Sequence, residues 1–190
     1  ASPAGDNLSI ESYRDDVLLL GNGWDLMVGH SLGGAVAAAV LAVRPDFAER
    51  VVFEDPAIDS DVTARLLAES PEPLAHPTVA AIAAENPNWH PRDVELKVEA
   101  LLACGPEISE RTMADGSRCD VWPDVLALEI PGLIVAADPE LGALVSETKG
   151  REAVATNTHL EFVLFDGAGH SMHRDAYDRF MPLVREFVVD

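Results

Sequence analysis

The chain has 190 residues, 48% of them hydrophobic and 24% charged, which is the balance of a globular protein with a real core. Its net charge of −20 argues against nucleic acid and against an anionic membrane surface as partners. It contains neither an apolar run of membrane-spanning length nor a signal peptide pattern, so we expect a cytoplasmic protein. Cys104 and Cys119 lack the spacing of a metal site or of a disulfide framework.

The first third of the chain predicts two helices and two short strands. Residues 9–20 carry apolar side chains at helical spacing, and Ser9 can cap that helix. The apolar run 26–28 predicts a buried strand, and the alanine- and valine-rich run 32–43 predicts a helix that ends before Pro45. A second buried strand is expected over residues 51–53, closed by Glu54, Asp55 and Pro56.

Residues 57–127 change in character, because prolines now separate short helical patterns. Helices are expected over residues 61–69, 78–86 and 92–103. Gly105 is expected to end the third helix, and an irregular segment is expected from there to residue 122. Since no strand pattern occurs, this region is predicted to be a helical cap inserted between two strands of one sheet.

The last third returns to alternating strands and helices. Strands are expected over residues 133–136 and 161–165, and helices over residues 147–156 and 175–188. Such alternation predicts an α/β fold in which a mostly parallel sheet is flanked by helices. The predicted core comprises residues 1–56 and 128–190, and the predicted cap residues 57–127.

Residues 29–34 read Gly-His-Ser-Leu-Gly-Gly and lie between a predicted strand and a predicted helix. We expect side chains at Gly29 and Gly33 to collide in so sharp a turn. The turn would lift the Ser31 hydroxyl to the start of the helix, with the N–H of Leu32 pointing to where an oxyanion forms. The alternative is a glycine-rich turn in which Ser31 only caps the helix.

A nucleophilic serine needs a base and a carboxylate that orients the base. His170 follows the last predicted strand and is the candidate base. Asp138 directly follows the preceding strand and is the first candidate acid, with Glu140 as the second. Asp55, one strand earlier, is a third candidate and could equally be a turn residue.

Other histidines and one tryptophan have weaker assignments. His30 and Trp89 are candidates for lining the substrate pocket, whereas His173 is expected at the surface of the next helix. No motif for a metal or an organic cofactor is present, so none is expected.

The chain resembles the alpha/beta hydrolase superfamily, as a serine-nucleophile member with a helical cap. The resemblance rests on residues 28–34, 131–138 and 167–171, and also on residues 54–56 and 86–89. It implies a serine hydrolase that cleaves a carboxylic ester or a related acyl bond of a small molecule. The acyl-enzyme would form on Ser31, with His170 as base and an Asp or Glu as orienter.

One departure from the superfamily concerns the residues before the motif. Only 28 residues precede Gly29, and they predict one helix and no earlier strand. The N-terminal strands and the oxyanion loop of such an enzyme are therefore expected to be missing. An exposed sheet edge would result, with weak activity and a tendency toward self-association. The alternatives are a non-catalytic fragment or binding module, and a carbon–carbon bond or lactone hydrolase using the same triad.

Overall fold

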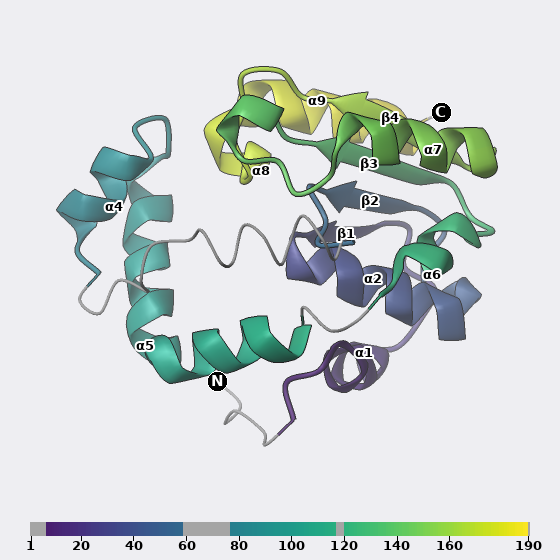
Figure 1. The fold of residues 1–190 in the computed structure, drawn as a ribbon, viewed down its shortest axis with the longest axis horizontal. Helices are drawn as coiled ribbons and strands as arrows, with labels where there is room; N and C mark the ends of the chain where they lie inside the picture. Colours follow the sequence, from purple (N-terminus) through teal and green to yellow (C-terminus); the bar gives the residue numbers. More distant parts are fainter. Residues whose placement is uncertain (1–6, 59–76, 117–119, 190) are drawn as a thin grey trace.

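The computed structural model describes residues 7–58, 77–116 and 120–189, and its centre is a parallel four-stranded sheet (Figure 1). The strands are adjacent in space in the same order as along the chain. Each strand is parallel to its neighbour, so all four carboxyl ends meet at one edge. The strands are β1 (Met27–His30), β2 (Val51–Glu54), β3 (Gly132–Ala136) and β4 (Leu160–Leu164).

Helices cover both faces of the sheet because successive strand side chains point to opposite faces. Val51 and Phe53 of β2 pack in one cluster with residues of α1, α2, α6 and α7, whereas Val52 packs with α8 and α9. The elements of the first face are α1 (Ile10–Leu18), α2 (Leu32–Val43), α6 (Trp122–Leu126) and α7 (Glu147–Thr156). Those of the second are α8 (Met172–Asp175) and α9 (Tyr177–Val189).

Two further helices, α4 (Val79–Glu85) and α5 (Pro91–Gly116), lie beside the layered core in Figure 1. Their shared apolar cluster consists of Ile82, Val94 and Val98, with Trp89 and Leu101 packed against it. Among the described residues of 57–127 all regular structure is helical, as predicted. The predicted helix 61–69 lies outside the described residues, and the limits of the cap stay a prediction.

The predicted end of the third helix at Gly105 is wrong, because α5 continues to Gly116. A glycine inside a helix costs only about 1 kcal/mol, which hydrogen bonds on either side can offset. Pro106 also lies inside this helix and lacks an N–H to donate. Helix α5 changes direction along its length in Figure 1, as expected for a helix with an internal proline.

Strand β1 lies at an edge of the described sheet, and its Val28 side chain is 49% exposed. Self-association through this edge stays a prediction. The C-terminal helix predicted over residues 175–188 is present as α9, and the one-turn helix α8 before it was not predicted. Within the described ranges, no helix is both long and apolar enough to cross a membrane.

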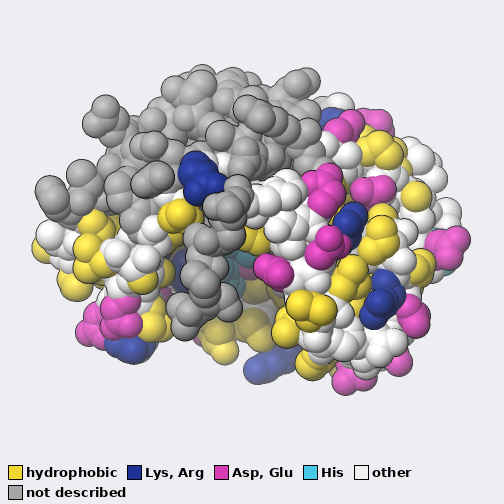
Figure 2. All heavy atoms as spheres, turned by 90° about the horizontal axis from the view of Figure 1, so that it is seen from below, with side chains coloured by type: hydrophobic (Ala, Val, Ile, Leu, Met, Phe, Trp, Pro, Cys, Tyr) yellow, Lys and Arg dark blue, Asp and Glu magenta, His cyan; other side chains and the backbone are white. Residues whose placement is uncertain are grey.

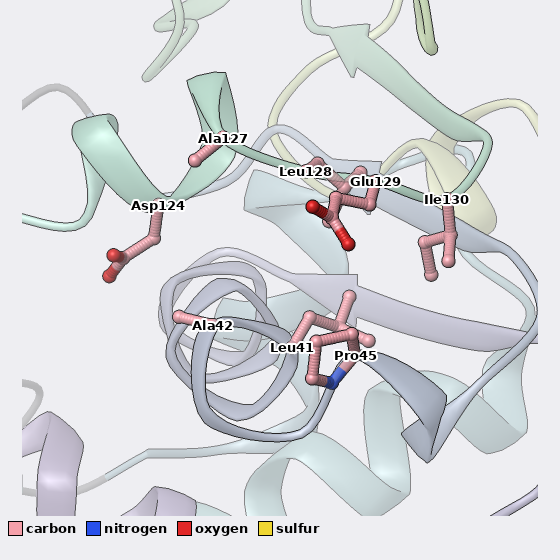
Figure 3. A pocket seen from close by; sticks show the side chains of 8 residues that line it. All are labelled: Leu41, Ala42, Pro45, Asp124, Ala127, Leu128, Glu129 and Ile130. Atoms are coloured by element: carbon pink, nitrogen blue, oxygen red, sulfur yellow. The ribbon is translucent and has the colours of Figure 1, made fainter.

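A cavity of about 230 Å³ lies at the C-terminal end of α2, against the segment between α6 and β3 (Figure 3). Its lining includes Leu41, Pro45, Asp124 and Glu129. Ser31 precedes the other end of α2, and a helix of that length spans about 18 Å. The cavity is therefore remote from the predicted nucleophile.

Candidate active site

Ser31 occupies a strained backbone position between β1 and α2. Its φ of 55° and ψ of −123° lie outside the regions that a residue with a side chain ordinarily adopts. The position is held from three sides, since the Ser31 N–H donates to the carbonyl of Glu54 at 3.0 Å. The carbonyl of Ser31 accepts from the N–H groups of Gly34 and Ala57, both at 2.9 Å.

Two glycines make this turn possible. A Cβ on Gly29 would lie 2.6 Å from the carbonyl oxygen of Gly33, and one on Gly34 would lie 2.4 Å from Cβ of Pro56. The predicted collision at Gly33 is wrong, because nothing lies within 4 Å of the position its Cβ would take. The second crowded glycine is Gly34, since α2 turns this residue, and not Gly33, toward the end of β2.

Leu32 is the first residue of α2, where N–H groups have no carbonyl one turn earlier to bond. Its N–H makes no backbone hydrogen bond among the described residues, so a donor is available beside Ser31. In the same part of the chain, no hydrogen bond joins the Ser31 hydroxyl to His170. Catalytic hydrogen bonds of this kind often form only once substrate is bound.

The imidazole of His170 is oriented by a buried carboxylate. Its Nδ1–H donates to Oδ2 of Asp55 at 2.6 Å, and the Asp55 side chain is fully buried. The same carboxylate accepts from the backbone N–H groups of Leu144, at 3.0 and 3.1 Å, and of Val145, at 3.3 Å. Asp55 is thereby fixed, and Nε2 is left as the nitrogen of His170 that can take up a proton.

The structure thus brings the third candidate acid, Asp55, to His170, and does not bring the first candidate, Asp138, to it. The carboxylate of Asp138 accepts instead from the N–H groups of Gly167 and Glu140, both at 2.8 Å. These two bonds, that of Gly167 first, lower the pKa of Asp138. The side chain of Glu140 is exposed. The loop after β3 therefore serves His170 indirectly, through the N–H groups of Leu144 and Val145 that hold Asp55.

His30, a predicted pocket residue, packs on His170 with 4.5 Å between the ring centres. Its Nε2 lies 2.9 Å from the backbone carbonyl of His170, which can only accept, so this nitrogen carries the proton. Burial, together with the charge of His170, lowers the pKa of His30 to about 4. His30 is therefore neutral near pH 7, and its hydrogen bond to the carbonyl of His170 supports the backbone there.

A second carboxylate–imidazole pair lies beside the first. Oε1 of Glu54, a side chain only 2% exposed, accepts from both the backbone N–H and the Nδ1–H of His173 at 2.8 Å. His173, expected at the surface of the next helix, is partly exposed at 32%, and its ring also meets that of His30. The sequence did contain a signal for this second pair. Glu54 and Asp55 are adjacent at the end of β2, and two histidines three residues apart, His170 and His173, follow late in the chain.

Trp89, the other predicted pocket residue, connects the helical region to the core. Its indole Nε1–H donates to Oδ1 of Asp175 at 2.6 Å, and the guanidinium of Arg174 lies 4.7 Å from the ring centre. Both partners belong to α8, the helix that begins just after His170. In the described ranges, no three His, Cys, Asp or Glu side chains are arranged to hold a metal ion.

This fold and these side chains at the ends of parallel strands are those of an alpha/beta hydrolase. The chain belongs to the alpha/beta hydrolase family, whose model matches residues 2–183. A comparison with curated protein sequences found no match.

Solved structures of several hydrolases have the same fold. E-2-(acetamidomethylene)succinate hydrolase is 23% identical, with a TM-score of 0.76 over 100% of this chain and 77% of the other. N-formylmaleamic acid deformylase from Pseudomonas putida is 18% identical, with a TM-score of 0.72 over 95% and 75%. An esterase from Exiguobacterium antarcticum is 12% identical, with a TM-score of 0.72 over 100% and 76%. The chain spans about three quarters of the length of each.

Proposed function

We propose that this chain is a serine hydrolase that cleaves a carboxylic ester or a related acyl bond of a small molecule through an acyl-enzyme on Ser31. The observation that carries the proposal is the 2.6 Å contact between Nδ1 of His170 and the buried Asp55, at the strand edge where Ser31 occupies its strained turn. Together these provide a nucleophile, a base and a group that orients the base.

The proposed reaction uses these groups in turn. Nε2 of His170 removes the proton of the Ser31 hydroxyl as Oγ attacks the substrate carbonyl carbon, and Asp55 stabilises the imidazolium that results. The N–H of Leu32 donates to the oxyanion of the tetrahedral intermediate. The intermediate collapses by breaking the bond to the leaving group, which takes the proton from His170. Water, activated by His170, then releases the acid product and restores Ser31.

Two substitutions at the acid position test the triad as assigned. Asp55→Asn is expected to lower turnover of p-nitrophenyl esters by about 10⁴-fold, because the wrong imidazole tautomer is favoured. Asp138→Asn is the matched control, and its activity is expected within a few fold of the wild type. If Asp138→Asn is inactive and Asp55→Asn is not, the assignment of the acid is wrong.

A fluorophosphonate probe tests the nucleophile separately, since it labels only an activated serine. Labelling is expected for the wild type and absent for Ser31→Ala, with circular dichroism showing that both are folded. An unlabelled wild type that is fully folded would support a non-catalytic binding module instead. Comparing aryl esters, lactones and diketones as substrates separates ester hydrolysis from lactone or carbon–carbon bond hydrolysis.

A further inference from the structure

Lys97 and Arg174 are two cationic side chains close enough to repel each other electrostatically, and neither has a carboxylate partner within the described ranges. Lys97 comes from α5 and Arg174 from α8, and both side chains are half-buried. No ion pair of either residue occurs among the described residues. This is unexpected in a chain with 33 acidic residues against 13 basic ones.

In α5, Lys97 lies beside the face of the helix that packs against α4. Val94, Val98 and Leu101 follow a helical repeat with it, and these three form the apolar cluster with α4. Burial lowers the pKa of the Lys97 ammonium, and the charge of Arg174 lowers it further. The two cations thus repel each other in a partly desolvated place, which an anion between them would relieve.

Arg174 is held in an orientation suited to a planar anion. Its guanidinium lies over the ring of Trp89, which is itself fixed by the 2.6 Å hydrogen bond to Asp175. A guanidinium stacked on an aromatic ring keeps its N–H groups directed outward in the plane, where a carboxylate can accept two of them. Asp175 is the nearest carboxylate along the chain, and it is engaged by Trp89 instead.

The geometry points to a carboxylate-binding subsite made by Arg174 and Lys97, which takes a free carboxylate of the acyl substrate whose reacting carbonyl lies at Ser31. The inference rests on the proposed hydrolase function, and it narrows the substrate class to esters or related acyl compounds that carry a second, ionised carboxyl group. Arg174 belongs to α8, the helix that begins just after His170, and its neighbour His173 has its ring against His30, which packs on His170.

Two esters of equal length test the subsite in the active protein. The p-nitrophenyl monoester of glutaric acid is anionic, and p-nitrophenyl pentanoate is neutral. The wild type is expected to prefer the anionic ester in kcat/KM. Arg174→Gln and Lys97→Gln are each expected to lower kcat/KM for the anionic ester by about tenfold or more and to change that for the neutral ester by less than about twofold. Equal losses on both esters, or no preference in the wild type, would overturn the subsite.

Two matched control variants leave the subsite intact. Arg179 is stacked over Phe165 at 4.5 Å and Lys149 over Trp122 at 4.5 Å, both away from α5. Arg179→Gln and Lys149→Gln should keep the substrate preference of the wild type. Should Arg174→Gln unfold, Lys97→Gln and Arg174→Lys carry the test, and the latter is expected to lose the preference in part.

A binding measurement separates this inference from the proposed function. Calorimetric titration of Ser31→Ala with monomethyl glutarate should show saturable binding that dimethyl glutarate lacks and that Arg174→Gln abolishes. Binding with this pattern but without ester turnover by the wild type would refute the hydrolase and keep the anion site. Turnover of neutral esters without such binding would refute the subsite and keep the hydrolase.

Discussion

At the scale of single residues, the candidate site depends on polar groups that the fold holds in place by hydrogen bonds. Asp55 accepts hydrogen bonds from backbone and imidazole while its own φ is 36°, a left-handed value that costs free energy for a residue with a side chain. This backbone conformation is stabilised by the bond from the N–H of Asp55 to the carbonyl of Val135 at 2.7 Å. Strain at both Ser31 and Asp55 is consistent with a site whose geometry the surrounding fold imposes.

His30 gives a prediction for stability against pH. Its pKa is about 4 in the folded protein and 6.5 in the unfolded chain, so the unfolded state binds more protons between these values. The free energy of unfolding should therefore fall as the pH drops from about 6.5 toward 4, and His30 contributes about 3 kcal/mol of that fall. Urea unfolding at several pH values checks this.

The matched control for His30 is His159, whose side chain is exposed. His30→Gln should flatten the slope of stability against pH in this range, and His159→Gln should leave it unchanged. Equal slopes in the wild type and His30→Gln would contradict the low pKa of His30.

At the scale of elements, the turn between β1 and α2 requires the start of α2 to lie very close to the residue after β2. Gly34→Ala is expected to destabilise the fold by about 1–3 kcal/mol, because the new Cβ overlaps Pro56 at 2.4 Å. Gly33→Ala, one residue away in the same helix, meets nothing within 4 Å and is expected to be neutral or stabilising by up to about 1 kcal/mol. Urea unfolding midpoints compare the two, and equal losses would refute the packing account.

The pairing of Glu54 with His173 anchors α8 to the end of β2. Glu54→Gln keeps the shape of the side chain and removes the charge that His173 pairs with. Because Glu54 is buried, we expect a loss of about 1–3 kcal/mol in unfolding free energy, with a lower kcat since the loop of His170 leads into α8. Glu49→Gln, at an exposed glutamate, is the control and should change neither quantity. Unchanged thermal stability of Glu54→Gln would contradict the anchoring role.

At the scale of the whole molecule, excess negative charge opposes compaction. On the coloured part of the face in Figure 2, which shows the described residues, acidic side chains lie at several separate places. The net charge of −20 makes self-repulsion in the folded state the dominant long-range term. In a chain with so many acidic residues, two neighbouring cations without an ion pair in the described part of the structure, Lys97 and Arg174, are unexpected.

Salt should therefore stabilise this protein. Raising NaCl from about 0.02 to about 0.5 M shortens the screening length to a few ångströms and is expected to raise Tm by several degrees. KCl should act equally, because the effect is screening. A Tm that stays constant or falls with either salt would show that the charges are already balanced locally.

The sequence by itself determined the alternation of elements, the parallel sheet and the strand-to-helix turn at Ser31. Helix α2 spans residues 32–43 and α7 residues 147–156, as predicted, because capping and composition act locally. The glycines around Ser31 and the placement of His170 after the last strand were likewise local signals, read from the order of residues.

Only the tertiary structure decided which carboxylate meets His170. Asp55 directly follows a buried strand, Asp138 follows one after a single residue, and both precede a proline, so their sequence contexts are nearly the same. The difference lies in where each side chain finds donors. Asp138 accepts hydrogen bonds from N–H groups of its own loop and of Gly167. Asp55 accepts them from Leu144 and Val145, and its carboxylate also contacts His170. Such contacts join residues about 90 positions apart and depend on the packing of loops at one sheet edge, which no local pattern encodes.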